Sequence, residues 1–338
     1  MQIGIRCDAG GEYGLGHISR MTTLVKAMKH VNMDAVITFY SKTPALWMSE
    51  HSPVGCDVIR FSPNDSEMKI MNYIYTHAID DILIIDRKDY YDAKQLTRMK
   101  ENMKIVCIDM PWAKPNECDL LVIPNIHCAP NVLDQLDKLF GERLLAGKEY
   151  VLLQEDVLVT TPLANKKREN WIAFFAGGSD PCNWMQRMYN MSEPLNDTLP
   201  NVARIYCIGQ HAETLQIHQH SPNAWIKGFD LKTLGKCALA VSLFGVTVYE
   251  AMYLRTPTIT TGHTKANEVG SQYLFVANEG ATYHIPPIDN MMREEFCAYI
   301  EDIWNSLSLR KDMHDKSHGL IGDSGALNIA ERILCLVP

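Results

Sequence analysis

The chain has 338 residues, of which 46% are hydrophobic and 21% charged, a composition typical of a globular protein long enough for two domains. Its formal net charge is −8 without any basic block, which argues against a nucleic-acid partner. No apolar run is long enough for a transmembrane segment, the N-terminus lacks a signal-peptide pattern, and the ten cysteines form no Cys-x-x-Cys motif. We therefore expect a cytoplasmic protein with reduced cysteines.

A glycine loop, Gly10–Arg20, is the first informative stretch. It follows the apolar run Ile3–Ile5 and precedes Met21–His30, where apolar residues recur at helical spacing. The pattern therefore predicts a strand, a glycine loop and a helix. Such a loop lets the backbone approach a ligand closely, and the helix N-terminus offers unpaired N–H groups. His17 lies where the loop becomes the helix and can exchange a proton near neutral pH, so it is our catalytic candidate.

Other interpretations of this loop are weaker. Gly14 and Gly16 supply half of the dinucleotide-binding GxGxxG pattern, but Ser19 takes the third glycine position and no acidic residue ends the second strand. A phosphate loop is excluded because no Gly-Lys-Ser/Thr follows. The remaining alternative is that His17 only caps the helix.

The first half of the chain alternates between strand-like and helix-like segments. We predict strands at Ile3–Ile5, Ala35–Tyr40, Asp81–Asp86, Lys104–Asp109 and Leu120–Ile123, with helices at Thr43–His51, Glu67–His77 and Ala93–Asn102 between them. Continuous apolar runs bounded by acids are typical of parallel strands buried on both faces. This alternation predicts a doubly wound α/β domain. Asp86 and Asp109 each end a strand, so we expect both at the carboxyl edge, where such sheets bind ligands.

A polar, turn-prone segment, Val157–Asn170, precedes a second series of the same kind. Strands are predicted at Trp171–Phe175, Ala203–Ile208, Ala224–Ile226, Leu239–Leu243 and Thr256–Thr260, with helices that include Asn183–Leu195 and Ala326–Leu336. We therefore expect two Rossmann-like domains, residues 1–158 and 159–338, facing each other across a cleft. The last helix is expected to tie down the end of the chain.

A second cluster of chemically informative residues lies in Ser242–Ala251. A predicted strand ends there, Gly245 makes a turn, and a helix begins at Val246 or Thr247. The N–H groups of this helix and the Thr247 hydroxyl could hold a diphosphate. Glu250, one turn further along, could accept both hydroxyls of a ribose. The alternative is a glycine needed only for a tight turn and an exposed helical glutamate.

A similar turn, Gly177-Gly178-Ser179, offers a second place for a phosphate, with Asp180 or Asn183 as the cap of the following helix. Ser179 is not a hydrolase nucleophile, because it lacks the Gly-x-Ser-x-Gly elbow. A metal site at His211, His218 and His220 is disfavoured, because no acids stand at ligand spacing around them.

Six motifs occur in a specific order along nearly the whole chain. They are Gly14–Arg20, Cys118-Asp119, Tyr150–Glu155, Gly177–Pro181, Gly245–Ala251 and Asp323–Ala326. In this order they resemble the GT-B nucleotide-sugar enzymes, and within them the pseudaminic-acid-pathway UDP-sugar hydrolases and their spore-coat-polysaccharide relatives. The resemblance implies a GT-B fold and a cytoplasmic role in nonulosonic-acid or surface-glycan synthesis.

The resemblance also implies a reaction and a division of labour. The N-terminal domain presents His17 to the sugar, where it orients or deprotonates a water. The water attacks the anomeric carbon of a UDP-linked deoxy amino sugar, and UDP is lost. Neither a metal nor a cofactor is implied, and no Asp-x-Asp metal motif occurs. The implied nucleotide-binding residues are Gly177, Gly178, Ser179, Ile226, Gly245, Val246, Thr247 and Glu250. The implied sugar-binding residues are Gly14, Gly16, Arg20, Asp86, Tyr90, Asp109, Asn267 and Glu268.

Four departures from these relatives fall where the sugar or acceptor should lie. They are the sequence Asp86–Tyr91, Met110 in place of a second acid, Phe244 in place of a small residue, and Asn267-Glu268 in place of Asn-Gln. The identity of the sugar, and water as the acceptor, are therefore left open. A glycosyltransferase on the same scaffold and a catalytically silent sugar-nucleotide-binding protein are the alternatives.

Overall fold

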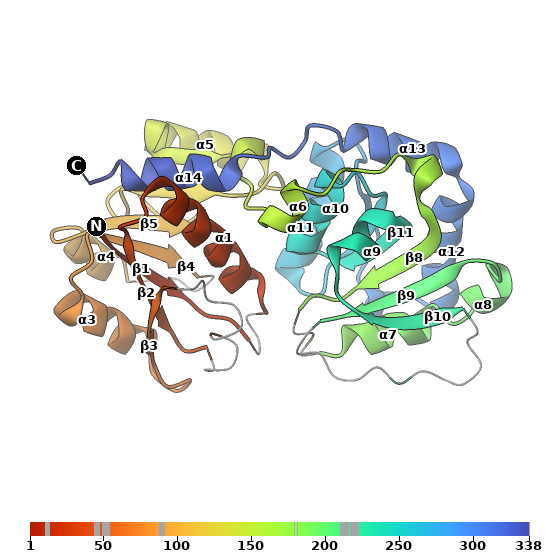
Figure 1. Cartoon of the computed structure of the whole chain (residues 1–338), viewed down its shortest axis with the longest axis horizontal. Helices are drawn as coiled ribbons and strands as arrows, with labels where there is room; N and C mark the ends of the chain where they lie inside the picture. The colour runs from red at the N-terminus through yellow and green to blue at the C-terminus, as the bar shows by residue number, and fades with distance from the viewer. Residues whose placement is uncertain are drawn as a thin grey trace. The chain divides into compact units, whose positions relative to one another are not determined.

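The structure is a computed structural model that describes residues 1–10, 14–43, 48, 55–87, 92–178, 180, 182–209, 216 and 223–337. The chain divides into two compact units (Figure 1). The first comprises Met1–Gln154 together with Gly322–Pro338, and the second comprises Glu155–Ile321. The polar segment 157–170 thus belongs to the second unit, and the end of the chain belongs to the first.

The first unit contains a seven-stranded sheet in which each pair of neighbouring strands is parallel, in the order β3-β2-β1-β4-β5-β6-β7. Its strands are β1 (Gln2–Cys7), β2 (Val36–Ser41), β3 (Asp57–Arg60), β4 (Ile82–Asp86), β5 (Lys104–Ile108), β6 (Leu120–Ile123) and β7 (Leu144–Ala146). Strands β4 and β6 are buried at every residue, as expected of strands covered on both faces.

Helices cover both faces of this sheet. They are α1 (Gly16–Val31), α3 (Glu67–His77), α4 (Ala93–Met99), α5 (Pro130–Phe140) and α14 (Gly325–Leu334). Helices α1 and α14 lie side by side and share one core with the strands, whereas α3, α4 and α5 share a core on the other face (Figure 1). The last helix therefore completes one layer of the first unit, and its buried Ile329 and Ile333 hold it there.

The second unit repeats the plan with a six-stranded sheet in the order β10-β9-β8-β11-β12-β13, again with parallel neighbours. Its strands are β8 (Glu169–Phe175), β9 (Ala203–Ile208), β10 (Ala224–Gly228), β11 (Cys237–Leu243), β12 (Thr258–Thr261) and β13 (Tyr283–His284). Its helices are α6 (Glu155–Leu158), α7 (Trp184–Met191), α8 (Leu195–Thr198), α9 (Leu231–Lys236), α10 (Val246–Tyr253), α11 (Lys265–Ala277), α12 (Arg293–Asn305) and α13 (Leu307–Lys316). Two α/β units with parallel sheets confirm the predicted fold class.

Some elements differ from the sequence prediction. The predicted helix Asn183–Leu195 is confirmed over its first part but extends too far, because α7 ends at Met191 and a new helix begins at Leu195. Pro194 lies between them, and proline has no N–H to continue the helical hydrogen bonds. Strands β3, β7 and β13 were not predicted: β7 and β13 have only three and two residues, and β3 is a short strand with charged, exposed ends. Most of the predicted helix 43–51 lies outside the described residues. No helix in the described part of the chain is long and apolar enough to cross a membrane.

Candidate active site

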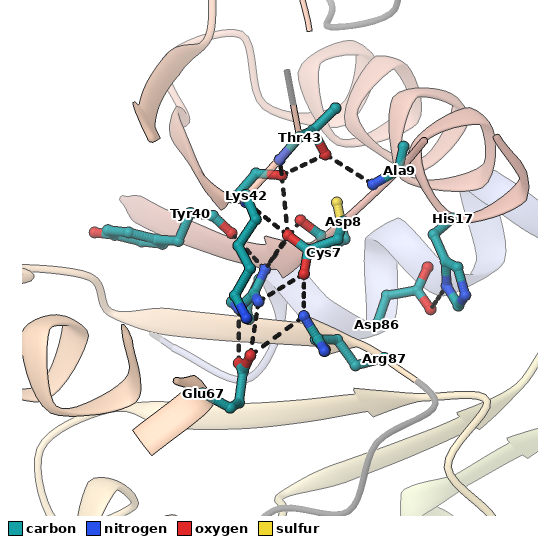
Figure 2. Close-up of polar contacts among 12 residues, drawn as sticks. Cys7, Asp8, Ala9, His17, Tyr40, Lys42, Thr43, Glu67, Asp86 and Arg87 are labelled. Atoms are coloured by element: carbon teal, nitrogen blue, oxygen red, sulfur yellow. Dashed lines mark hydrogen bonds and ion pairs between the residues drawn. The ribbon is translucent and has the colours of Figure 1, made fainter. Parts of the chain in front are cut away.

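A histidine and an aspartate meet at the carboxyl edge of the first sheet. His17 is in the first turn of α1, and Asp86 is the last residue of β4. The Nδ1 atom of His17 lies 2.8 Å from Oδ1 of Asp86, and both side chains are buried (Figure 2). The alternative that His17 merely caps α1 is wrong, because the cap position is Leu15 and no side chain makes a capping hydrogen bond there. The side chain of His17 instead faces the end of β4.

Arg20 joins this pair to a second aspartate. It lies three residues beyond His17, on the same face of α1. Its Nε donates to Oδ2 of Asp86 at 2.7 Å, its Nη2 donates to Oδ1 of the same residue, and its Nη1 donates to Oδ2 of Asp109 at 3.0 Å. The two strand-terminal aspartates therefore do lie at one edge, and a single arginine bridges them.

The ionisation of Asp86 follows from its neighbours. Burial alone would raise the pKa of this carboxyl, but the charge of Arg20 and the hydrogen bonds from Arg20 and His17 overcome that effect and hold the pKa well below its usual range. Burial likewise opposes the charge of Arg20, yet the two aspartates raise the pKa of its guanidinium above the ordinary value. The site therefore keeps Asp86 as a carboxylate, which can only accept hydrogen bonds.

This carboxylate determines the tautomer of His17. Nδ1 lies 2.8 Å from Asp86 and 3.2 Å from Nη2 of Arg20, so the carboxylate is the closer partner. We assign the proton of the neutral imidazole to Nδ1, where it is donated to Asp86. The lone pair is then on Nε2, which can accept a proton from a reacting group.

The edge of the sheet contains two further polar residues that the sequence analysis missed. Asn125 follows β6, and its Nδ2 donates to Oδ1 of Asp109 at 3.1 Å. His127 lies near the same aspartate; burial lowers its pKa, which Asp109 partly offsets. Asp109 itself has a positive φ of 58°, an uncommon backbone conformation for a residue with a side chain. The only feature of the sequence that could have pointed to Asn125 is its position just beyond the end of a strand, as for Asp109.

The glycine loop is closed by its own backbone. The N–H of Gly10 donates to the carbonyl of Gly14 at 2.9 Å, and both residues have positive φ, which glycine adopts without strain. Gly16 is the first residue of α1. Gly14 and Gly16 are half-buried, beside His17.

In the second unit, Glu250 is a buried carboxyl that has no side-chain partner among the residues that the structure describes. It lies on α10 and is 2% exposed, which excludes the alternative of an exposed helical glutamate. Within the described residues, no hydrogen bond or ion pair involves its side chain, and burial raises its pKa to about 7. A buried carboxyl of this kind is costly unless a ligand supplies the missing hydrogen bonds.

The start of α10 is open. Gly245 occupies the cap position with extended backbone, and no side chain caps the helix. A Cβ atom built on Gly245 would meet nothing within 4 Å. Gly245, Val246 and Thr247 are half-buried. They lie at the start of α10, about one helical turn before Glu250.

The second glycine turn is tightly packed against a neighbouring strand. Gly177 has a φ of 90°, and a Cβ on Gly209 would lie 2.1 Å from the carbonyl oxygen of Gly178. The cap position of α7 is Asn183, whose side chain makes no capping hydrogen bond. Asp180, three residues earlier, accepts from the N–H groups of Trp184 at 2.7 Å and Met185 at 2.8 Å and so satisfies the first two N–H groups of the helix. A phosphate held here would therefore contact the glycine backbone rather than the N-terminus of α7.

The remaining predicted residues are divided between the units and the gaps in the description. Ile226, on β10, is 39% exposed. Asn267 and Glu268 are in the second unit, at the start of α11, whereas the other predicted sugar-binding residues belong to the first unit. Asn267 donates to the carbonyl of Phe244 at 3.1 Å and so supports the loop before Gly245. Tyr90 and Ser179 lie outside the described residues.

No cluster of three or more metal-binding side chains occurs in the described ranges. His211, His218 and His220, which were considered as a metal cluster, lie outside them.

Comparison with known proteins identifies the fold. No family model matches the chain. A protein of Methanocaldococcus jannaschii, described as uncharacterized protein MJ1062, is 22% identical over 285 residues, which cover 77% of this chain and 55% of that protein. The chain thus spans about half the length of this curated relative.

Solved structures match over almost the whole chain. The glycotransferase of kitacinnamycin has a TM-score of 0.68 at 12% identity, covering 100% of this chain and 99% of its own. The S. aureus MnaA–UDP structure has a TM-score of 0.68 at 12% identity, covering 99% and 96%. The UDP-GlcNAc 2-epimerase from Neisseria meningitidis, bound to UDP-GlcNAc, has a TM-score of 0.63 at 10% identity, covering 99% and 100%. The chain therefore has the GT-B fold.

Proposed function

We propose that this protein binds a UDP-sugar and hydrolyses it at the anomeric carbon, releasing UDP and the free sugar. The first unit acts on the sugar and the second binds the nucleotide. The observation that carries the proposal is the His17 imidazole, held by an ionised Asp86 with the lone pair assigned to Nε2. A base of this kind and a site for a diphosphate leaving group are the two requirements of the reaction.

The chemical step needs only the chain's own groups and a water. Nε2 of His17 takes a proton from the water, and the water oxygen forms a bond to the anomeric carbon. The bond between that carbon and the diphosphate oxygen breaks, and UDP leaves with the electron pair. The charge of Asp86 stabilises the imidazolium that forms, while Arg20 keeps Asp86 ionised and oriented.

In the second unit, the partnerless carboxyl of Glu250 supports the assignment of a nucleotide site. Ionised, it can accept hydrogen bonds from both ribose hydroxyls, and the uncapped start of α10 can hold the diphosphate. Backbone at Gly177 and Gly178 would hold the other phosphate oxygens, and Ile226 would contact the base. A UDP ligand is favoured because two of the matching structures are described with UDP or UDP-GlcNAc bound.

Sugar transfer to an acceptor other than water is the second candidate. It is supported by the match to the kitacinnamycin glycotransferase and by a MurG structure from Acinetobacter baumannii, with a TM-score of 0.61 at 12% identity. The same base would then deprotonate an acceptor hydroxyl. Hydrolysis of a UDP-linked deoxy amino sugar rests on the motif resemblance, and transfer rests on these folds.

The test is incubation of the protein with a panel of UDP-sugars, with and without acceptor sugars, while UDP release is measured. UDP release without an acceptor supports hydrolysis, and release only with an acceptor supports transfer. Binding without release of any kind would support a silent binding protein. If UDP at millimolar concentration does not raise the melting temperature, the UDP assignment is wrong, since a ligand at a hundredfold excess over its Kd stabilises by about 2.7 kcal/mol.

A further inference from the structure

A second buried charge cluster lies beside the His17–Asp86 pair. We call it the clamp, and it consists of Arg6 on β1, Asp8 just after β1, Glu67 at the start of α3, and Arg87 just after β4 (Figure 2). Arg6 holds both carboxylates with two contacts each, at 2.6 and 2.7 Å to Asp8 and at 2.7 Å to each oxygen of Glu67.

Arg87 completes the clamp. Its Nη1 contacts Oδ2 of Asp8 and lies 3.2 Å from Oε2 of Glu67. The side chains of Arg6, Asp8 and Arg87 are at most 3% exposed, so solvent screens the contacts among these three residues little, whereas the Glu67 side chain is 21% exposed. The two arginines and two carboxylates of the clamp balance in charge.

The clamp lies at the end of the sheet, next to Asp86. In the register between β1 and β4, the last pair is Cys7 with Asp86. The residues that follow this pair are Asp8 after β1 and Arg87 after β4. Their ion pair joins the two segments where the backbone hydrogen bonds between the strands end. Figure 2 shows Asp86 turned toward His17 while Arg87 turns toward Asp8 and Glu67. Asp86 is therefore held through its own side chain, which contacts His17 and Arg20, and through the next residue, Arg87, which is paired with Asp8.

Asp8 also connects the start of the glycine loop to the end of β2. Oδ1 of Asp8 accepts from the backbone N–H of Lys42 at 2.7 Å and from the Ser41 hydroxyl at 3.2 Å. The next residue, Ala9, donates its N–H to the hydroxyl of Thr43 at 2.7 Å. Through Asp8, the end of β2 and the loop that leads to His17 are tied to the residue that follows Asp86.

We propose that Arg87 and Asp8 are positioning residues for the His17–Asp86 pair, acting through the backbone at the ends of β1 and β4. The proposal rests on the proposed function only for the catalytic use of the pair, and the contact itself can be tested without substrate. An arginine suits this place because one rigid guanidinium spans two carboxylates, which a lysine does not reproduce.

The first experiment observes the imidazole of His17 directly. Nitrogen-15 NMR distinguishes the two tautomers of a neutral histidine, and the His17→Ala variant assigns the signal among the 12 histidines. In the unmodified protein we expect the proton on Nδ1. In Arg87→Met, which leaves Asp8 paired with Arg6, we expect a mixture of tautomers; Arg87→Lys should be intermediate. An unchanged His17 signal in a folded Arg87→Met protein overturns the proposal.

Tyr40→Phe is the matched control, because it removes a buried 2.8 Å hydrogen bond to Asp80 in the same unit and keeps the Tyr40 carbonyl that accepts from Arg6. It should lower the melting temperature without changing the His17 signal. If Arg87→Met does not fold, Arg87→Gln replaces it, since its shorter, uncharged amide removes the ion pair with Asp8 but keeps a polar group at this position; an unchanged tautomer there is equally contradictory.

The second experiment uses turnover, once a substrate is known. Misplacement of a catalytic group by about 1 Å can cost roughly 100-fold in rate. We expect Arg87→Met to lower kcat by about 10- to 100-fold with KM and the Kd of UDP nearly unchanged, because the nucleotide residues are in the other unit. Equal effects of Arg87→Met and Tyr40→Phe on kcat would assign Arg87 a merely structural role. Failure to find any turnover would count against the proposed function, whereas the NMR result would stand.

Discussion

Nδ1 of His17 lies 2.8 Å from Oδ1 of Asp86, although 69 residues separate them in the chain. The contact exists because β1 and β4 are neighbours in the sheet, so that the helix after β1 begins beside the end of β4. A neutral histidine can carry its proton on either ring nitrogen. The contact with Asp86 fixes the proton on Nδ1 and leaves Nε2 free to act as a base.

His17→Ala should reduce turnover by at least 100-fold, the lower end of what a positioned base contributes, and leave the affinity for UDP nearly unchanged. The reason is that His17 lies in the first unit, whereas the proposed nucleotide residues lie in the second. Calorimetric titration of UDP together with single-turnover rates measures both effects. A large loss of UDP affinity in this variant would mean that the glycine loop holds the nucleotide.

Glu250→Ala should show the reverse pattern, with UDP binding weakened by about 1.5–3 kcal/mol, the usual value of hydrogen bonds to a charged group. Turnover of the bound substrate should change less, because a contact to the ribose is made equally in the ground and transition states. The same calorimetric and single-turnover measurements apply. Unchanged UDP affinity in Glu250→Ala would remove this residue from the nucleotide site.

The stability of the unliganded protein should fall as the pH rises toward 7. Burial raises the pKa of Glu250 from 4.5 to about 7, so between these values the folded protein binds a proton that the unfolded chain releases. The contribution amounts to about 3 kcal/mol across this range, at 1.36 kcal/mol per pKa unit. Glu250→Gln should remove this slope and make the protein more stable at pH 8. Urea unfolding from pH 5 to pH 8 measures it, and parallel curves for the two proteins would contradict the prediction.

Arg20→Met should lower the free energy of unfolding at pH 7 by about 3–5 kcal/mol, because it leaves the fully buried carboxylate of Asp86 without its principal counter-charge. Since the pKa of Asp86 is lowered in the folded protein, this stabilisation is present at neutral pH and is lost as the pH falls below about 4. The curves of variant and parent should converge there in denaturant titrations.

The matched control for Arg20 is Lys69→Met, which breaks the ion pair of Lys69 with Asp65 on the surface. Exposed pairs one helical turn apart contribute about 0.5 kcal/mol or less. If both substitutions destabilise the protein equally, the buried bridge has no special role.

Gly209→Ala should destabilise the second unit by about 1–3 kcal/mol and weaken UDP binding, because the new methyl group would overlap the carbonyl of Gly178. Gly228→Ala is the control at the end of the adjacent strand, where an added Cβ meets nothing within 4 Å. Thermal unfolding with and without UDP measures both effects. Equal tolerance of the two alanines would show that the close approach of β9 to the glycine turn is dispensable.

Local patterns were sufficient for the architecture. Continuous apolar runs predicted the buried strands, since a strand covered on both faces has no polar side to show, and the strands Leu120–Ile123 and Ala203–Ile208 were predicted to the residue. The short strands at the sheet edges escaped prediction because two of them have only two or three residues, and β3 is bounded by exposed charged residues instead of forming a continuous apolar run. Helix 183–195 was overextended across Pro194, although the proline itself was visible in the sequence.

The sequence by itself determined which residues stand at strand ends and helix starts, and therefore that His17, Asp86, Asp109 and Glu250 were candidates. Only the tertiary structure decided their partners. The bridge from Arg20 to two aspartates, the contact of Asn125 with Asp109 and the clamp around Asp8 and Arg87 join residues up to 89 positions apart. The order of the strands brings them together, and that order arises from packing across the whole sheet, which no local pattern of residues encodes.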